Sequence, residues 1–206
     1  MPAIPGYRVI SHLADGGFGS VFRAEPAAGG APVVIKIART GRVGADTYLA
    51  KEIAVLTSVG APHVPAVFAH GTIAGGLPYV VMEQLGGGSL AEWLGARAEP
   101  VPVPLAIAMA LAMLRPLEAV HAKGFVHCDL KPENVFLDER LDMRLLDFGL
   151  ARPARAVDRT IEEGAEGVPA GTADYMSPEQ CAGEPDLDGR TDLYALAVML
   201  FELVAG

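Results

Sequence analysis

Three consecutive glycines, Gly86–Gly88, divide the chain into two parts with different apolar patterns. Before them, short apolar runs typical of strands alternate with turns, and only one segment has helical spacing. After them, most apolar residues recur at intervals of three and four, as they do along helices. With 206 residues, the chain is long enough for one large domain or two small lobes. The pattern predicts a β-rich small lobe over residues 1–85 and a mainly helical larger lobe over residues 86–206.

The first part is expected to form strands around a single helix. The expected strands are Tyr7–Leu13, Ser20–Ala24, Pro32–Ile37, Val64–Ala69 and Tyr79–Met82. The segment Asp46–Val59 is expected to be helical because Leu49, Ile53 and Leu56 recur at four and three. Gly60 and Pro62 would then end this helix.

The second part is expected to be mostly helical. The expected helices are Ser89–Arg97, Val103–Lys123 and Asp192–Val204, with Ser89 as an N-cap. Pro116 should bend the long helix or make it start again. Two short strands, Val135–Leu137 and Met143–Leu146, flank a polar turn. The polar segment Arg155–Ala170 is expected to be a mobile loop.

Charge and cysteine content exclude several classes of protein. The formal net charge is −9 and the pI is near 5.0, which argues against a nucleic-acid or anionic-membrane surface. Cys128 and Cys181 alone cannot make a disulfide framework or a four-cysteine metal site, and both suit a reducing compartment. The longest apolar runs, Val103–Leu114 and Leu193–Phe201, are too short for a membrane span, and the first residues do not form a signal peptide. We expect a cytoplasmic protein with no membrane segment in this chain.

The segment His127–Asn134, HCDLKPEN, concentrates reactive side chains in eight residues. It holds a His, two carboxylates, a Lys and an Asn, and Pro132 stiffens its middle. Such a run is too polar for a core strand and too rich in reactive groups for an ordinary connecting loop. A turn that uses Asp and Asn for local hydrogen bonds is the structural alternative.

Two motifs in the first part suggest contact with phosphates. The stretch Ala14–Val21, ADGGFGSV, is a Gly-rich turn whose backbone N–H groups could approach phosphate oxygens, although a plain hairpin turn would look the same. Lys36 ends an apolar strand, and Glu52 lies sixteen residues later on the helix face of Leu49 and Leu56. We expect an ion pair that aims the ammonium at phosphates; a lysine extending from a strand end into solvent is the alternative.

Two further motifs follow the reactive segment. Asp147-Phe-Gly149 lies thirteen residues beyond Asn134 and follows a strand-like run. The stretch Gly171–Glu179 reads GTADYMSPE. In this order, from about Tyr7 to Gly206, the motifs resemble the signature set of protein kinases. The DLKPEN and GTADYMSPE forms are similar to those of bacterial, eukaryotic-like serine/threonine kinases.

The resemblance implies an α+β fold with two lobes. It implies a five-stranded antiparallel small lobe with one helix, over residues 1–85, and a helical large lobe over residues 86–206 that lacks the last helices of the family. The implied reaction is transfer of the ATP γ-phosphoryl group, with Mg²⁺, to a Ser or Thr hydroxyl of a protein substrate.

Roles for individual residues follow from the same resemblance. Asp129 is the implied catalytic base, Lys131 steadies the transferred group, and Asn134 and Asp147 hold the metal, since Mg²⁺ prefers oxygen ligands. The residues implied to contact or position ATP are Gly16, Gly17, Phe18, Gly19, Val21, Val34, Lys36, Glu52, Met82, Glu83, Leu85, Phe136 and Asp147.

Other residues are implied to support the site. Thr172 should hydrogen-bond near Asp129 and Lys131, unless it only caps a turn. Asp192 should brace the backbone of the catalytic loop; as an alternative it is simply the N-cap of the last helix, or both. Four apolar or packed residues match the family's internal column: Leu56, Val67, His127 and Phe148.

The sequence departs from the family pattern at several points. Ala14 replaces the first glycine of the turn, Val34 replaces a small alanine, and Ser177 replaces an alanine. The chain is also short at its C-terminus, so Leu196, Met199, Leu200 and Leu203 are expected to leave apolar surface exposed. A partner or a further C-terminal region could cover that surface.

Two other functions compete with the kinase interpretation. A truncated or non-catalytic nucleotide-binding or scaffolding module is favoured by the short C-terminus and disfavoured by the intact charged positions. A dinucleotide-binding oxidoreductase is excluded because a strand, not a helix, follows Gly19.

Cys128 occupies the position where most kinases of this family carry an arginine that pairs with a phosphate on the activation segment. A cysteine has no fixed positive charge, and we interpret it as a small buried hydrophobic residue. We therefore predict that Thr160→Ala leaves the rate of phosphoryl transfer to a generic protein substrate nearly unchanged. A collapse of activity in this variant would contradict the prediction.

Overall fold

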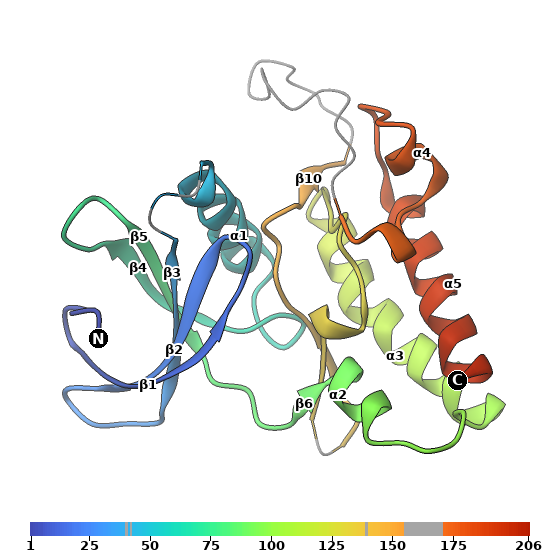
Figure 1. The fold of residues 1–206 in the computed structure, drawn as a ribbon, viewed down its shortest axis with the longest axis horizontal. Helices are drawn as coiled ribbons and strands as arrows, with labels where there is room; N and C mark the ends of the chain where they lie inside the picture. Colours follow the sequence, from blue (N-terminus) through green and yellow to red (C-terminus); the bar gives the residue numbers. More distant parts are fainter. Residues whose placement is uncertain (40, 42, 139, 155–170) are drawn as a thin grey trace. The chain divides into compact units, whose positions relative to one another are not determined.

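The computed structural model describes residues 1–206 except 40, 42, 139 and 155–170. The expected loop Arg155–Ala170, with Thr160, lies outside the described residues. The chain divides into two compact units, Met1–Leu85 and Gly86–Gly206 (Figure 1).

The first unit is a five-stranded sheet with one helix. The strands are β1 (Tyr7–Asp15), β2 (Gly19–Pro26), β3 (Val33–Ala38), β4 (Val67–Thr72) and β5 (Pro78–Glu83). Their order in the sheet is β1-β2-β3-β5-β4, and every neighbouring pair is antiparallel. This confirms the predicted small-lobe architecture. The strand expected from Val64 begins only at Val67, because Pro65 has no N–H to donate to a ladder.

Helix α1 (Ala45–Val59) presents one face to the sheet. Ala45, Leu49, Glu52 and Leu56 are buried, and their spacing of four, three and four residues puts them along one side of a helix. The Gly60 N–H donates to the Leu56 carbonyl and ends the helix, as the sequence predicts.

Cross-strand pairing sorts the side chains of this sheet onto two faces, because residues directly opposite each other point to the same side. Phe22, Ile35 and Val81 are opposite one another and pack in an apolar cluster on one face. Val21 and Lys36 form the neighbouring row, so they point to the other face. Glu52 of α1 meets Lys36 there, which shows that α1 packs on this second face.

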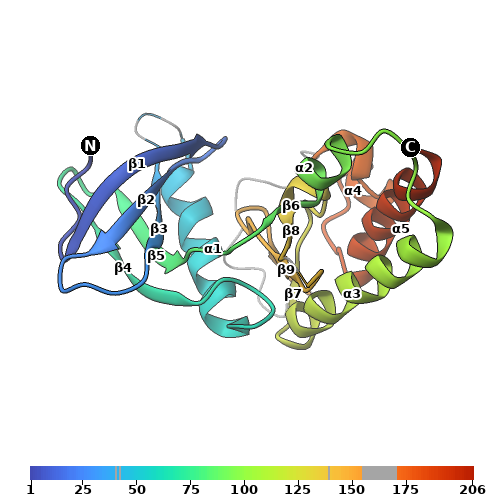
Figure 2. The same cartoon turned by 90° about the horizontal axis from the view of Figure 1, so that it is seen from below.

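The second unit is mainly helical. Its elements are β6 (Gly88–Ser89), α2 (Leu90–Gly95), α3 (Val103–Ala122), β7 (Phe125–Val126), η1 (Pro132–Asn134), β8 (Val135–Leu137), β9 (Met143–Leu145), β10 (Arg152–Pro153), η2 (Ala173–Tyr175), α4 (Pro178–Cys181) and α5 (Gly189–Ala205). The long helices α3 and α5 lie side by side (Figure 2). Small sheets of β6-β8-β9 and β10-β7 carry the loops of the site.

The helix boundaries follow local capping. Ser89 accepts a hydrogen bond from the Glu92 N–H, and the Glu92 carboxylate accepts from the Ser89 N–H, which confirms Ser89 as an N-cap. Helix α3 runs through Pro116 without starting again. Helix α5 begins at Gly189, three residues before the predicted start, because Asp188 is its N-cap. The alternative that Asp192 is only an N-cap is therefore wrong.

The exposed apolar side chains of α5 are not the predicted ones. Leu196, Met199 and Leu203 are buried and Leu200 is half-buried, whereas Phe201 is 73% exposed. Leu193, Tyr194 and Val204 are also exposed. The helix is apolar on nearly all sides, so the sequence could not show which face packs on the rest of the unit.

One helix among the described residues, α3, is long and apolar enough to cross a membrane by length and composition. The apolar run read from the sequence was shorter because Arg115 interrupts it. Met109, Met113, Leu117 and Val120 of α3 are buried inside the unit. Core helices satisfy the same criteria, so the length of α3 is weak evidence for a span.

Gly87 provides a test of the packing between β6 and β8. Its φ is 124°, and a Cβ built there would lie 2.0 Å from the Leu137 carbonyl oxygen. We predict that Gly87→Ala lowers the free energy of unfolding of this unit by about 2 kcal/mol or more, because both the backbone and the strand must shift. Urea unfolding measures the change.

The matched control for this variant is Gly86→Ala. A Cβ at Gly86 meets nothing within 4 Å, and its φ is not positive. Equal unfolding midpoints for the two variants would contradict the prediction.

Candidate active site

The first unit contains a buried ion pair. The Lys36 Nζ atom of β3 lies 2.6 Å from Glu52 Oε2 of α1, and the two side chains are only 14% and 5% exposed. Glu52 is buried because it shares the inner face of α1 with Leu49 and Leu56. The expected strand–helix ion pair is confirmed, and it fixes the direction of the Lys36 ammonium.

Three apolar residues predicted to contact ATP share the sheet face of Lys36. Val21 is opposite Lys36, and Val34 is opposite Met82. Because Val34 and Lys36 are two residues apart on β3, both rows point to the same side. Val21, Val34, Lys36 and Met82 therefore lie on one face of the sheet, which Arg23, opposite Val34, also shares.

The Gly-rich turn joins β1 to β2 at the end of this surface. The Gly16 N–H donates to the Gly19 carbonyl at 2.8 Å and closes the turn. A Cβ at Gly19 would lie 2.8 Å from the Ile37 carbonyl oxygen, so the packing against β3 requires glycine there. Gly16 and Gly17 are exposed, so a ligand could approach their backbone. Phe18, between them and Gly19, is half-buried.

The other residues predicted to contact ATP include Glu83 and Leu85, at the end of the first unit, and Phe136. The Glu83 carboxylate accepts a hydrogen bond from the Ala66 N–H, and the Glu83 N–H donates to the Ala66 carbonyl. This pairing orders the chain just before Leu85. Phe136 belongs to the second unit, where it is half-buried and lies opposite Ser89 and Arg144 in the small sheet.

Asp192 organises the segment His127–Asn134, named here the catalytic segment after the role that the resemblance implies for it. Its carboxylate is 1% exposed and accepts hydrogen bonds from the backbone N–H groups of His127, at 2.9 Å, and Cys128, at 3.0 Å. Its Oδ2 also lies 2.7 Å from the His121 Nε2 atom of α3. The predicted bracing of the catalytic loop is confirmed.

His127 is a packed residue. Its Nδ1 lies 3.3 Å from the Asp129 N–H donor, and its Nε2 lies 3.0 Å from the Leu146 carbonyl oxygen. With these partners, Nδ1 accepts a hydrogen bond and Nε2 donates one. The ring also packs against Phe148, with centroids 4.7 Å apart, as the internal column predicts within this unit.

Cys128 has a strained backbone that is held on both sides. Its φ is 64°, which is rare for a residue other than glycine. Asp192 binds its N–H, and Gln180 Nε2 donates to its carbonyl at 2.8 Å. Its side chain packs in an apolar cluster with Val126 and Leu187, which agrees with its interpretation as a small buried hydrophobic residue.

The next residue, Asp129, has an unusually full set of partners. Its Oδ1 accepts from the Thr172 N–H at 2.8 Å and from the Thr172 hydroxyl at 2.9 Å. Its Oδ2 accepts from Asn134 Nδ2 at 3.3 Å and lies 3.2 Å from Lys131 Nζ. Lys131 Nζ also donates to the Thr172 hydroxyl at 2.7 Å. Thr172 is therefore placed near Asp129 and Lys131, as predicted.

Asn134 and Asp147 lie at adjacent points of the backbone. The Leu146 N–H donates to the Asn134 carbonyl at 2.9 Å, which holds the residue before Asp147 against Asn134. The Asn134 amide nitrogen is bonded to Asp129, so its oxygen is the atom left to accept or coordinate. Asp147 has a φ of 57°, an uncommon value that sharply redirects the chain.

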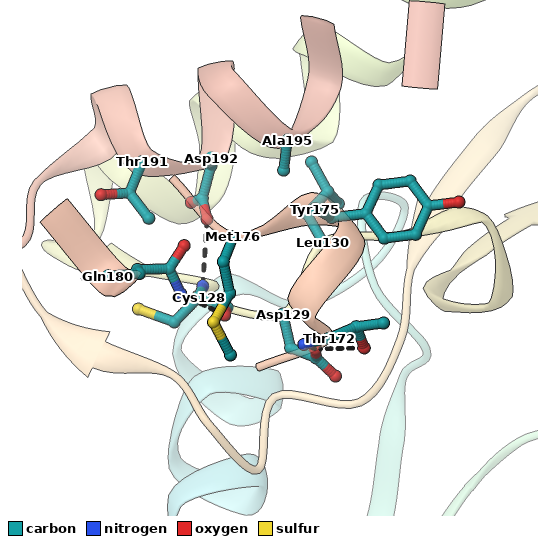
Figure 3. Close-up of a pocket in the computed structure, with 10 residues that line it drawn as sticks. All are labelled: Cys128, Asp129, Leu130, Thr172, Tyr175, Met176, Gln180, Thr191, Asp192 and Ala195. Atoms are coloured by element: carbon teal, nitrogen blue, oxygen red, sulfur yellow. Dashed lines mark hydrogen bonds between the residues drawn. The ribbon is translucent and has the colours of Figure 1, made fainter. Parts of the chain in front are cut away.

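Behind the catalytic segment lies a small hollow. Figure 3 shows residues from the catalytic segment, the GTADYMSPE stretch and α5 converging on it. Its lining is Cys128, Asp129, Leu130, Thr172, Tyr175, Met176, Gln180, Thr191, Asp192 and Ala195. The side chains pack so closely that no water molecule fits between them. These residues therefore support the catalytic segment by packing and do not form a ligand pocket.

Two ionisable groups of the GTADYMSPE stretch have shifted pKa values. Burial raises the pKa of the Tyr175 hydroxyl far above its usual range, and its hydrogen bond to Glu202, 2.8 Å long, adds to the effect. The pKa of Glu179 is lowered, first by the hydrogen bond from its own backbone N–H and then by those from Thr191 and Ser177, while burial opposes the shift. The hydrogen bonds from Tyr175 to Glu202 and from Thr191 to Glu179 join this stretch to α5.

Comparison with known proteins agrees with this geometry. Residues 7–206 match the protein kinase domain. This chain belongs to the protein kinase family. It is 31% identical to the serine/threonine-protein kinase Pkn1 of Myxococcus xanthus and 34% identical to PknL of Mycobacterium tuberculosis, in each case over 97% of this chain. It covers 29% and 49% of those two proteins, so it spans less than half the length of either relative.

Several residues of the kinase domain site were missed by sequence reasoning. His121 shares the Asp192 carboxylate, and Gln180 holds the Cys128 carbonyl. Tyr175 bonds to Glu202, ten positions beyond Asp192 on α5. The only sequence signal for Gln180 was the S-P-E-Q capping pattern, which is present at Ser177. No local pattern pointed to His121 or Glu202.

Asp192 provides a test of the support of the catalytic segment. We predict that Asp192→Asn lowers the free energy of unfolding by about 1–3 kcal/mol, because an amide cannot accept from two backbone N–H groups and from His121 together. Chemical denaturation measures the loss.

The matched control is Asp188→Asn at the start of the same helix. Asparagine caps helices as well as aspartate, and the Arg190 partner is exposed, so the cost should stay below about 1 kcal/mol. If the Asp192 variant were no less stable than this control, the bracing role would be refuted.

Proposed function

We propose that this chain is the catalytic domain of a serine/threonine protein kinase, which transfers the γ-phosphoryl group of ATP to a protein hydroxyl. One observation carries the proposal: Asp129, Lys131 and Thr172 form a closed hydrogen-bonded group beside Asn134. The two serine/threonine-protein kinases named above support the same reaction class by similarity.

The residues fit a magnesium ion that shares its ligands with ATP. The Asn134 amide oxygen and the Asp147 carboxylate are hard oxygen donors, and their backbones are joined through the Leu146 hydrogen bond. Among the described residues, no three His, Cys, Asp or Glu side chains gather as a complete metal cage. When bound, Mg²⁺ would neutralise charge on the phosphates. Asn134 and Asp147 would hold it.

The partners of Asp129 suggest how this carboxylate acts. Its four interactions, two on each oxygen, occupy its acceptor sites and keep it oriented. A substrate hydroxyl must therefore displace one of them. The Lys131 ammonium is the mobile partner, since its side chain is long and partly exposed. When it moves to a phosphoryl oxygen, Asp129 Oδ2 is free to accept the hydroxyl proton.

The first unit would supply the nucleotide contacts. The apolar side chains of Val21, Val34 and Met82 suit contact with a flat aromatic base, and the Lys36 ammonium suits contact with phosphate oxygens. Glu52 limits the directions that this ammonium can take. The extra methyl groups of Val34, compared with alanine, would narrow the surface for the base.

The substrate and the cellular location of the protein stay predictions. A Ser or Thr of a protein substrate is the proposed acceptor, and the net charge of −9 gives no reason to expect nucleic acid. A cytoplasmic location is proposed from the cysteine content alone. A scaffolding module that binds nucleotide without transfer is the alternative, but the complete Asp129 group does not favour it.

Asp129→Asn tests the proposed reaction. We predict that it lowers the rate of transfer of radiolabelled γ-phosphate to a generic protein substrate by about 10²- to 10⁴-fold, the usual contribution of a general base. Binding of Mg·ATP, followed by calorimetry, should remain within a few-fold, because Asp129 is not a nucleotide contact. The Asn side chain keeps the shape and one acceptor oxygen.

Measurements of transfer and of Mg·ATP binding on the wild-type protein distinguish a kinase from a scaffolding module. Transfer that depends on Asp129 supports the kinase. Tight Mg·ATP binding with no transfer by either protein would identify the scaffolding alternative, and neither binding nor transfer would refute both.

A further inference from the structure

An aromatic pair connects the Gly-rich turn to helix α1. The rings of Phe18 and Tyr48 are stacked, with centroids 3.7 Å apart and an angle of 21° between their planes. Both side chains are half-buried, and neither belongs to the apolar cluster on the far face of the sheet. The stack is therefore a separate contact between two elements of the first unit.

Tyr48 lies one helical turn before Glu52 on α1. Residues four apart lie on the same side of a helix, so the stack and the Lys36–Glu52 ion pair use neighbouring positions. Gly44 makes room for the ring: a Cβ there would lie 3.3 Å from Tyr48 Cε2, and the Gly44 carbonyl accepts from the Tyr48 N–H. The start of α1 is thus shaped around Tyr48.

Phe18 is also bound to the chain that follows β3. Its carbonyl accepts from the Arg39 N–H at 2.9 Å. Its neighbour Gly19 packs against Ile37 and Lys36. One residue at the tip of the turn therefore contacts α1 through its ring and the end of β3 through its backbone. Movement of the turn would disturb the two elements that carry Lys36 and Glu52.

We propose that Tyr48 is a positioning residue, which through Phe18 sets the place of the Gly-rich turn relative to the Lys36–Glu52 ion pair. The role in nucleotide binding rests on the proposed function; the coupling of turn and helix does not. Tyr48 has no assigned part in phosphoryl transfer, and its hydroxyl is not needed for the stack. The ring itself is the functional part.

The coupling predicts a specific pattern among variants. Leucine fills much of the space of an aromatic ring but cannot stack, whereas phenylalanine can. Tyr48→Leu should raise the KM for ATP about two- to tenfold, the factor that an aromatic pair of ordinary strength provides, with a smaller effect on kcat. Tyr48→Phe should behave as the wild type.

The partner ring provides the decisive comparison. Phe18→Leu should raise the KM for ATP at least as much, because Phe18 is also predicted to contact ATP. The double variant Phe18→Leu/Tyr48→Leu should be no worse than the more affected single variant, because the two changes remove one interaction. Phe68→Leu, at an exposed aromatic residue of β4 in the same unit, is the matched control and should have no effect.

Hydrogen exchange of the nucleotide-free protein tests the coupling without activity. Backbone amides of residues 16–22 and 45–52 should exchange about two- to tenfold faster in both leucine variants than in the wild type, Tyr48→Phe and the Phe68 control. Mass spectrometry of peptides from these segments gives the rates.

The outcomes separate the two proposals. Unchanged exchange in both leucine variants overturns the coupling, whether or not the protein is a kinase. Faster exchange with an unchanged KM in an active wild type shows a purely structural contact and also overturns the positioning role. A wild type that neither binds nor uses ATP refutes the proposed function, and the exchange rates alone then decide the coupling.

Discussion

The hydrogen bonds of the buried Asp192 carboxylate hold together the site of the second unit. Burying a carboxylate is unfavourable unless its oxygens are paired. Here the backbone N–H groups of His127 and Cys128 and the His121 ring provide those partners. Because these groups come from α3 and from the catalytic segment, the Asp192 carboxylate joins α5 to both. The position of Asp129 is a consequence of this packing.

The first unit also contains a buried carboxylate, but this one is paired with a charged side chain. It belongs to Glu52, which pairs with the Lys36 ammonium. A pair of opposite charges is weaker as a structural support, since both ions lose solvation. It is more useful for function, because the cation can be shared with an anionic ligand. Asp192 fixes the backbone of His127 and Cys128, whereas Glu52 orients the Lys36 ammonium, which can still bind an anionic ligand.

Several features could be predicted because they depend on local spacing. The strand that carries Lys36 and the helical phase of Glu52 predicted their ion pair. The place of Thr172 near Asp129 was implied only by the resemblance to protein kinases. The buried face of α5 could not be predicted, since the helix is apolar on most sides and only packing on α3 selects Leu196 and Met199. The start of α5 was missed because Asp188 and Asp192 are both good caps. The stack of Phe18 on Tyr48 joins segments whose approach no local pattern reveals.

Cys128 shows how the backbone of a catalytic segment can be held without a charged side chain at this position. Its positive φ turns the chain so that Asp129 faces Thr172 and Lys131, and such a conformation persists only when its surroundings impose it. Asp192 fixes the peptide N–H and Gln180 fixes the carbonyl, so the turn is determined from both ends. The small thiol fills the apolar space beside Val126 and Leu187 and donates a weak hydrogen bond to the Val126 carbonyl. The backbone at residue 128 is held by buried hydrogen bonds to Asp192 and Gln180, and the cysteine itself carries no positive charge. A phosphate elsewhere in the chain therefore has no cation at this position through which to turn Asp129.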